Sequence, residues 1–211
     1  MNGVILVGGP SGSGKSPFAV GMVKQLREIG YVVLDVDMDD YYKEGELENY
    51  EDISAVDLDL FCDNLVMIFN GQTYLKPKYN HRTYTRTVKR SACCKCDFVV
   101  IEGLHTLNMD YFNNFEYPLL RILIMVDLWV ALGRNIWWNN HYGRSFRYSA
   151  YYWETYKRES TESLNNIKNY DIKLDFGVNN VDVFFDKDKF EAGIELVLDK
   201  MQDIGWLESN A

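Results

Sequence analysis

Short apolar runs alternate along this chain with longer segments in which apolar residues recur every three or four positions. Such runs are typical of strands buried on both faces of a parallel sheet, and the longer spacing is typical of helices that pack on it. The pattern predicts an α/β unit with strands at Val4–Val7, Tyr31–Val36, Asp97–Ile101, Leu119–Val126 and Ile172–Phe176. It predicts helices over Phe18–Ile29, Ala55–Phe69, Leu128–Ile167 and Lys187–Ile204.

A pair of short segments rich in tyrosine and threonine interrupts this alternation. They lie near Thr73–Leu75 and Arg82–Val88, after the turn residues Asn70-Gly71, and they predict a β-hairpin at about residues 72–90 that stands away from the main sheet. The chain shows no internal repeat or linker, and 211 residues suit one domain. We therefore expect one domain over residues 1–211 with the hairpin as an insertion.

The first predicted strand leads into a glycine-rich loop, Gly9-Pro10-Ser11-Gly12-Ser13-Gly14-Lys15-Ser16. It fits the phosphate-loop pattern of Gly, four residues and Gly-Lys-Ser, in which backbone N–H groups turn toward a phosphate at the positive end of the next helix. We expect Lys15 to reach the β- and γ-phosphates of a nucleoside triphosphate and Ser16 to ligate Mg²⁺. The predicted nucleotide-binding residues are Gly9, Ser11, Gly12, Ser13, Gly14, Lys15, Ser16 and Pro17.

Pro17, directly after this motif, is unusual. Proline suits the first turn of a helix, but it has no N–H group to donate to the α-phosphate. If that donor is normally used, its loss costs about 1–3 kcal/mol of nucleotide binding.

Carboxylates follow two of the predicted strands. Asp39 lies just beyond the second strand and is our candidate for a catalytic base, with Asp37 and Asp35 as alternatives on the same side of the strand. Glu102 ends an otherwise apolar strand, where a carboxylate is costly unless it meets a metal or hydrogen-bond donors. Since ligands of parallel sheets bind at the carboxyl ends of strands, we expect Asp39 and Glu102 to converge on the phosphate loop as Mg²⁺ and acceptor groups. The alternative for the aspartates is a solvated turn cap.

Composition and charge limit the classes of partner that this protein is expected to bind. With 31 acidic and 22 basic residues, the net charge is −9, which argues against DNA or RNA because a polyanion needs a basic face. No apolar run approaches the ~18–20 residues that span a bilayer, and no signal peptide precedes the first strand, so we expect a cytoplasmic protein without a membrane partner. Cys93, Cys94 and Cys96 are bunched, but they lack zinc-site spacing and are interpreted as reduced thiols.

Several motifs occur in the order found in the uridine kinase and phosphoribulokinase family, which the chain resembles over about residues 3–176. They are the phosphate loop, Asp39-Asp40-Tyr41-Tyr42-Lys43, Pro77-Lys78-Tyr79-Asn80 with Thr85-Arg86, and Glu102-Gly103-Leu104-His105-Thr106-Leu107-Asn108. The resemblance implies a P-loop NTPase fold of three α/β/α layers with a mainly parallel five-stranded sheet. It also implies ATP and Mg²⁺, a hairpin-bearing acceptor site and a helical lid at about residues 133–148.

The resemblance assigns Asp39 as the base and Glu102 to the metal side, but the acceptor side matches less closely. Asn80 stands where the family has Asp, and Tyr84 stands where it has His, unless a shifted register brings in His81. Asn49-Tyr50-Glu51-Asp52 resembles a segment that supplies an acidic ribose contact, so either Glu51 or Asp52 is a candidate. The predicted acceptor-binding residues are Tyr42, Glu51, Tyr79, Tyr84, Arg86 and His105, with a packed histidine as the alternative for His105.

The lid departs most from the family pattern. Three expected arginines are replaced by Asn135, Trp138 and Tyr142, and such arginines contribute strongly to phosphoryl transfer. Arg134 and Arg144 remain as predicted catalytic cations, followed by Arg147, each with a plain surface arginine as the alternative. The aromatic residues between Trp137 and Trp153 form either a stacking platform or, as we prefer, a packed core or dimer face.

Three hypotheses for function follow. The first is a kinase that phosphorylates the 5′-hydroxyl of a nucleoside such as uridine or cytidine. The second is the same reaction on another small hydroxylated acceptor, such as nicotinamide riboside or a sugar phosphate. The third is a nucleotide-binding protein with little kinase activity that acts through a partner. The sequence leaves the acceptor and a homo-oligomeric state open.

Overall fold

The fold comes from a computed structural model. It describes residues 1–45, 47, 49–91, 95–113, 115–141, 150–177 and 186–208, and the side chains of these residues except 139–141 and 150–153.

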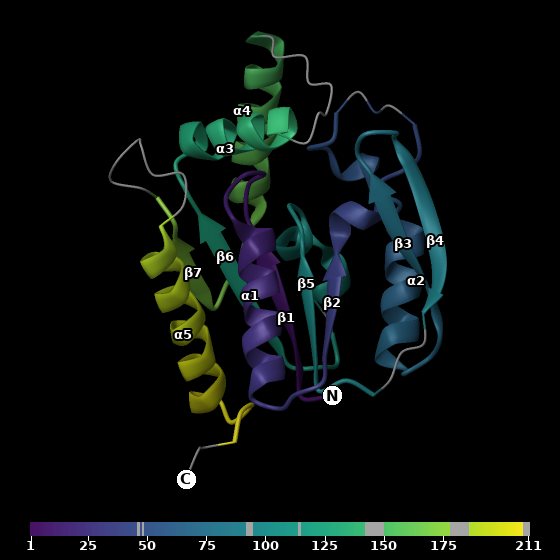
Figure 1. Ribbon diagram of the computed structural model, residues 1–211, viewed down its shortest axis with the longest axis vertical. Coiled ribbons are helices and arrows are strands. Elements are labelled where there is room, and N and C mark those ends of the chain that lie inside the picture. The colour runs from purple at the N-terminus through teal and green to yellow at the C-terminus, as the bar shows by residue number, and fades with distance from the viewer. Residues whose placement is uncertain are drawn as a thin grey trace.

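Five parallel strands form the central sheet, in the order β2-β5-β1-β6-β7. Their bounds are β1 Gly3–Gly8, β2 Val33–Asp37, β5 Phe98–Glu102, β6 Leu119–Met125 and β7 Ile172–Asp175. The carboxyl ends of the strands point toward the top of Figure 1. The predicted five-stranded parallel sheet is therefore confirmed.

Helices cover both faces of the sheet and its carboxyl edge (Figure 1). Helices α1 Lys15–Glu28 and α5 Lys187–Asp203 pack on one face, and α2 Leu58–Phe69 lies on the other side with the hairpin. Helices α3 Leu128–His141 and α4 Ala150–Asn166 stand over the carboxyl ends of the strands. The connections include the 3₁₀ turns η1 Met38–Tyr41, η2 Ile53–Ala55, η3 Thr106–Asn108 and η4 Asp110–Phe112.

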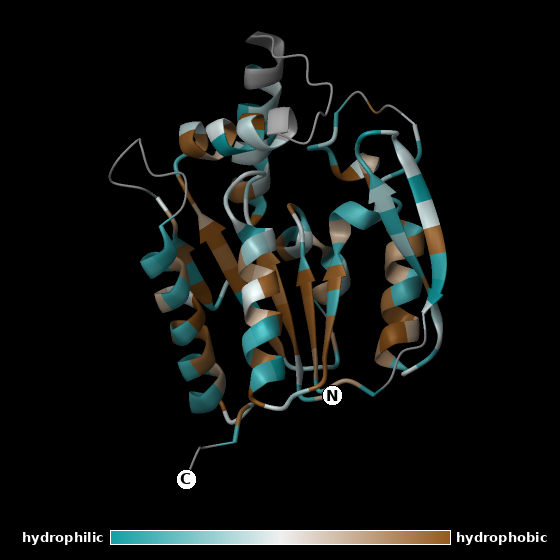
Figure 2. Cartoon of the chain, in the orientation of Figure 1, coloured by the Kyte–Doolittle hydropathy of each residue, from teal (hydrophilic) through white to brown (hydrophobic). Residues whose placement is uncertain are grey.

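Alternate residues of each central strand enter two separate cores. In β1, Ile5 and Val7 pack against α1 and α5, whereas Val4 and Leu6 pack against α2 and the segments near it. Figure 2 shows the central strands β1, β5 and β6 mostly in the brown of apolar residues, whereas the hairpin strands β3 and β4 are largely teal or white. A continuous apolar run was the correct strand signal because both faces of the sheet are covered.

The predicted hairpin exists, but its strands have different bounds. Strand β3 is Tyr74–Asn80 and β4 is Thr85–Ser91, paired antiparallel from Asn80 opposite Thr85 to Tyr74 opposite Ser91. The prediction that the second strand begins at Arg82 was wrong, because residues 81–84 form the turn, in which Tyr84 has a φ of 54°. Most of β4 is exposed, so no apolar alternation marks its start.

Two predicted helix bounds also differ. The helix expected from Ala55 begins at Leu58, because the Asp57 carboxylate accepts a hydrogen bond from the N–H of Leu60 and caps the helix there. The helical stretch expected over residues 128–167 is described as α3 and α4, and residues 142–149 between them lie outside the described residues. Among the helices that the structure describes, none is long and apolar enough to cross a membrane.

The Asp57 carboxylate joins the hairpin to α2. Besides capping α2, it forms a 2.9 Å ion pair with Arg86 of β4. Asn64 of α2 adds a second connection, since its side-chain amide donates to the carbonyl of Leu75 in β3 at 2.7 Å.

We expect Asp57→Ala to lower the free energy of unfolding by about 2 kcal/mol, because it removes both the cap and the half-buried partner of Arg86. Asp59→Ala, in the exposed first turn of the same helix, is the matched control and should change stability by less than about 0.5 kcal/mol. Urea unfolding followed by circular dichroism measures both. Equal stability of the two variants would contradict the assigned role of Asp57.

Candidate functional site

The phosphate loop, residues 9–16, connects β1 to α1 and has a backbone that favours glycine at three positions, Gly9, Gly12 and Gly14. Gly12 and Gly14 have φ values of +82° and +103°. A Cβ atom on Gly12 would lie 2.0 Å from the carbonyl oxygen of Ala131 in α3. The backbone of α3 therefore packs directly on the outside of this loop, and a side chain at residue 12 is excluded.

Lys15 and Ser16 begin α1 and face Glu102 at the carboxyl end of β5. The Lys15 side chain is buried, and Glu102, opposite Val7 of β1 in register, is 3% exposed. Burial raises the pKa of Glu102 to about 7, while the charge of Lys15 and the hydroxyl of Ser16 act to lower it. The Oε2 atom of Glu102 has no hydrogen-bond partner among the described residues, so this carboxylate has a lone pair available for a cation.

Asp39 lies in η1, directly after β2, as the sequence predicted. Its N–H donates to the carboxylate of Asp37 at 2.9 Å, and its negative charge acts on Glu102 and on Glu51. Burial and the neighbouring Glu102 raise the pKa of Asp37. Asp39 is thus held by the backbone beside the other carboxylates, and its role as the base stays a prediction.

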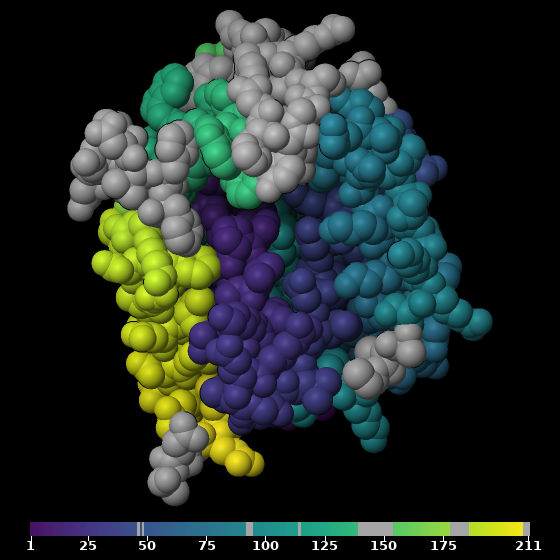
Figure 3. Space-filling model, in the orientation of Figure 1, coloured from purple at the N-terminus to yellow at the C-terminus, as the bar shows by residue number. Residues whose placement is uncertain are grey.

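Asp35, the third candidate on this strand, lies away from the loop. Its charged neighbours include Lys76 and Arg27, and it lines a shallow hollow of about 520 Å³ beside α1. Figure 3 shows the surface hollowed between α1 and the hairpin. Asp37 lies opposite Glu102 in register, and Asp39 and Asp35 both act on Glu102 through their charge.

Glu51 lies closer to the phosphate loop than its sequence motif suggested. Its carboxyl group is buried and faces the side chain of Ser11, with Lys15 and Asp39 nearby. Burial raises the pKa of Glu51 to about 7. The ring nitrogen Nε2 of His105 lies 3.0 Å from the carbonyl oxygen of Glu51, which ties this segment to the end of β5.

His105 and Asp52 also line a cavity of about 670 Å³ between α2, the η3 and η4 turns and the second half of α4. Burial lowers the pKa of His105. Asp52 caps η2, since its carboxylate accepts from the N–H of Ser54 at 2.7 Å. Of the two acidic candidates for an acceptor contact, Glu51 is the one that the structure brings to the phosphate loop.

Aromatic rings beside η1 form one packed cluster. Tyr42 contacts Tyr50 and Tyr79 with ring centroids 5.3 and 5.5 Å apart, and Tyr50 stacks on Tyr84 at 6.4 Å. The hydroxyl of Tyr42 donates to the carbonyl of Tyr50 at 2.9 Å, and the hydroxyls of Tyr50 and Tyr79 lie 3.4 Å apart. His81 packs edge-on against Tyr79. Three predicted acceptor residues, Tyr42, Tyr79 and Tyr84, are therefore in contact with other rings.

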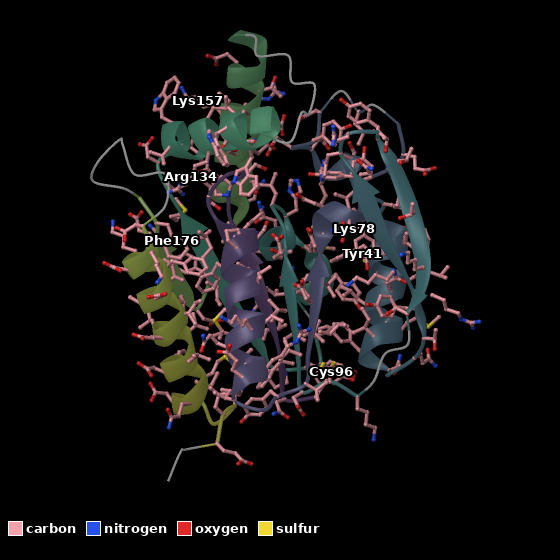
Figure 4. All side chains as sticks on the ribbon, in the orientation of Figure 1. Tyr41, Lys78, Cys96, Arg134, Lys157 and Phe176 are labelled. Atoms are coloured by element: carbon pink, nitrogen blue, oxygen red, sulfur yellow. The ribbon has the colours of Figure 1, made fainter. Side chains whose placement is uncertain are left out.

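Arg86, another predicted acceptor residue, has protein partners. Besides its ion pair with Asp57, its guanidinium donates to the carbonyls of Tyr41 and Tyr42 at 3.4 Å each. It attaches the hairpin to η1. In Figure 4 the labelled Tyr41 and Lys78 lie on this side of the molecule, where Lys78 pairs with Asp40 at 2.9 Å.

Arg134 of α3 contacts the back of the phosphate loop. It is 8% exposed and donates to the carbonyls of Ser13 at 3.3 Å and Phe176 at 3.2 Å. Figure 4 shows Arg134 between α3 and the strand ends, above Phe176. The Nε atom of Arg134 has no partner among the described residues. Arg134 therefore binds the backbone of the phosphate loop, a contact that the sequence analysis, which expected a lid cation or a surface arginine, did not predict.

Other residues of the predicted lid are described only in part. Arg144, Arg147 and Tyr142 lie outside the described residues. Trp137 and Trp138 are about half exposed and contact each other with ring centroids 5.4 Å apart. The choice between a stacking platform and a packing face for the aromatic segment stays open.

Tyr156 of α4 is a site residue that the sequence reasoning missed. Its side chain is fully buried and its hydroxyl donates to the carbonyl of Ser11 at 2.6 Å. A tyrosine in a polar, aromatic-rich helix carries no sequence signal of this contact, because it depends on how α4 crosses the strand ends.

The residues that the structure describes include no group of three or more His, Cys, Asp or Glu side chains arranged to hold a metal. Cys62 and Cys96 are free thiols, and Cys93 and Cys94 lie outside the described residues. A site with few protein ligands suits Mg²⁺, which keeps several waters and binds one or two carboxylates together with substrate phosphates.

Comparison with known proteins identifies a family. The profile of the phosphoribulokinase / uridine kinase family matches residues 4–148. The chain is 32% identical to a uridine kinase of Macrococcus caseolyticus over 132 residues, which is 59% of this chain and 61% of that protein. It is 32% identical to a uridine kinase of Vibrio cholerae over 115 residues, 48% of this chain and 52% of that protein. The chain thus spans less than two thirds of these relatives' lengths.

Solved structures share the fold at low sequence identity. A structure described as a "possible uridine kinase" from Bacillus stearothermophilus is 21% identical, with a TM-score of 0.53 over 81% of this chain and 86% of that one. D-glycerate 3-kinase from Cryptococcus neoformans is 15% identical, with a TM-score of 0.60 over 83% of this chain and 85% of that one. These similarities support a kinase-type P-loop fold.

Pro17 is exposed at the third position of α1. We expect Pro17→Thr to tighten ATP binding by about fivefold or more, because it restores an N–H donor at the helix start. Isothermal titration with ATP measures the change. Pro77→Thr, a control outside the site in β3, should leave the affinity unchanged. Unchanged binding in Pro17→Thr would mean that no phosphate contacts this position.

The pKa of Glu51 gives a prediction for stability against pH. Because its folded pKa of about 7 exceeds its ordinary value of 4.5, the folded state retains the proton more strongly, and stability falls as pH rises from about 4.5 to 7. Glu51→Gln should weaken this fall and stabilise the protein at pH 8 by up to about 3 kcal/mol. Urea unfolding at pH 5 and pH 8 measures it, with exposed Glu195→Gln as the control. If the free energy of unfolding changed with pH by the same amount in the wild type and in Glu51→Gln, the raised pKa would not belong to Glu51.

Proposed function

We propose that this chain, which belongs to the phosphoribulokinase / uridine kinase family, transfers the γ-phosphoryl group of ATP to a hydroxyl group of a small molecule. The observation that carries the proposal is that the buried Lys15 and the carboxylate of Asp39 both act through their charge on the buried Glu102 and Glu51 beside the phosphate loop. Phosphoryl transfer needs a phosphate cradle, a cation, a metal site and a carboxylate for the acceptor. These residues are suited to each of those tasks.

On the donor side, the loop backbone and Lys15 would bind the phosphates. The hydroxyl of Ser16 and the free oxygen of Glu102 fit Mg²⁺, because both are oxygen ligands and Glu102 Oε2 has no partner among the described residues. Asp39, also a predicted metal ligand, would reach the ion only through a bound water, which leaves its carboxylate for the acceptor. When bound, Mg²⁺ would neutralise charge on the transferred phosphoryl group.

On the acceptor side, Asp39 would orient and deprotonate the attacking hydroxyl. Its backbone is held by the hydrogen bond from its N–H to the Asp37 carboxylate. Glu51 would contact a second hydroxyl of the acceptor, since it lies between Ser11 and Lys15. Because relatives at about 32% identity are named uridine kinase, a nucleoside with its 5′-hydroxyl is the first candidate acceptor.

The packed tyrosine cluster favours a second candidate. A nucleobase needs an open aromatic slot, but Tyr42, Tyr50, Tyr79 and Tyr84 contact one another. An acceptor without a base, such as a sugar phosphate or another hydroxylated metabolite, would not require these rings to separate. The two candidates share the donor side, Asp39 and Glu51.

An acceptor panel distinguishes the candidates. Purified protein is incubated with Mg²⁺-ATP and uridine, cytidine, nicotinamide riboside, sugar phosphates or hydroxy acids, and ADP formation and product mass are followed. A phosphorylated nucleoside would establish the first candidate and another phosphorylated acceptor the second. ATP binding without phosphorylation of any acceptor would contradict the kinase proposal and favour a nucleotide-binding protein that acts through a partner.

Two variants test the residue roles on whichever acceptor is found. Asp39→Asn should lower turnover by about 10²- to 10⁴-fold while ATP affinity stays within about twofold, because the phosphate loop is untouched. Lys15→Ala should abolish turnover and weaken ATP binding. Exposed Asp59→Asn is the matched control for Asp39→Asn. Loss of ATP binding in Asp39→Asn would assign Asp39 to the metal or to structure.

A further inference from the structure

Helices α3 and α4 contact three consecutive residues of the phosphate loop from outside. The hydroxyl of Tyr156 in α4 donates to the carbonyl of Ser11 at 2.6 Å. The backbone of Ala131 in α3 lies against Gly12, and Arg134 of α3 donates to the carbonyl of Ser13 at 3.3 Å.

The side chains of Tyr156 and Arg134 donate to two carbonyl oxygens of the loop, those of Ser11 and Ser13. Each of these carbonyls shares a peptide unit with the N–H group of the next residue. The structure has no cis peptide bond among the residues it describes. In a trans peptide the C=O bond and the following N–H bond point in opposite directions. A donor that holds the Ser11 carbonyl outward therefore turns the N–H of Gly12 inward, and a donor on the Ser13 carbonyl does the same for Gly14.

The intervening amide has a different use. The N–H of Ser13 donates to the carbonyl of Pro10 at 3.0 Å and closes the loop turn. Within the described residues, the N–H groups of Gly12 and Gly14 have no recorded acceptor. Alternate amides of the loop are thus left available for an anion, and these are the two amides whose preceding carbonyls have side-chain donors.

We infer that Tyr156 is a positioning residue for the donor phosphates, which acts by holding the Ser11 carbonyl so that the Gly12 N–H points into the phosphate cradle. The inference rests on the proposed function, because it presumes that a triphosphate binds this loop. Tyr156 is suited to the task because it is fully buried and its rigid ring places one hydroxyl with few rotatable bonds. Arg134 does the same for Gly14 through the Ser13 carbonyl.

The arrangement also links the loop to both α3 and α4. Residue 11 is held from α4, whereas residues 12 and 13 are held from α3. The two helices therefore jointly set the direction of the loop amides. Deleting one hydroxyl on α4 should affect one amide and leave the other.

Tyr156→Phe tests the inference, because it removes only the hydroxyl. The probes are ATP and inorganic tripolyphosphate, titrated by calorimetry at a temperature where circular dichroism shows both proteins folded. We expect the dissociation constants of both probes to rise by about fivefold. Tyr170→Phe, the same change at an exposed tyrosine before β7, is the matched control and should bind both probes as wild type does.

A second measurement separates positioning from a general loss of packing. In protein labelled with ¹⁵N-glycine, tripolyphosphate should shift the amide resonances of Gly12 and Gly14 in the wild type. In Tyr156→Phe the response of Gly12 should shrink while that of Gly14 persists. Lower stability with unchanged tripolyphosphate affinity and an unchanged Gly12 response would overturn the inference and assign Tyr156 to packing alone.

The outcomes also separate this inference from the proposed function. If the wild-type protein binds neither ATP nor tripolyphosphate, the proposed function fails and the inference fails with it. If the wild type and Tyr156→Phe bind both probes equally, the proposed function stands and only the role of Tyr156 is overturned.

Discussion

The buried ammonium group of Lys15 is the constraint on which the site depends. A buried charge is costly unless opposite charges lie near it, and the charge of Lys15 acts on the buried carboxylates of Glu102 and Glu51, on which Asp39 acts as well. Each carboxylate comes from a different segment: the end of β5, the connection before η2, and η1 after β2. The parallel sheet places these carboxylates near Lys15, because it brings the ends of β5 and β2 beside the loop that follows β1.

The same group holds more negative than positive charges. Asp39 adds a third negative charge near Glu51 and Glu102, and burial raises the pKa of both Glu51 and Glu102 to about 7. An additional cation is the simplest way to ionise both carboxylates, because an opposite charge nearby favours the charged form. Binding of Mg²⁺ with a triphosphate and the acid–base state of the site are therefore coupled in this proposal.

Around Lys15 and these carboxylates, several polar side chains contact backbone carbonyl groups. His105 lies against the carbonyl of Glu51, Tyr156 and Arg134 hold loop carbonyls, and Arg86 contacts the carbonyls of Tyr41 and Tyr42. The side chains that the family pattern places around an acceptor are in part engaged in such contacts. Under the proposed function, acceptor preference would depend on which of these contacts open when a substrate binds.

The sequence by itself determined the sheet, the phosphate loop and the carboxylates at the strand ends, because continuous apolar runs and the Gly-Lys-Ser spacing are local signals. It misplaced the start of α2 and of β4, where a capping carboxylate and an exposed polar strand set the bounds. Only the tertiary structure brought Glu51 to Ser11, Tyr156 to the loop and Arg134 to Ser13. Those contacts join residues more than 35 positions apart, and they depend on how the helices cross the sheet, which a local pattern does not encode.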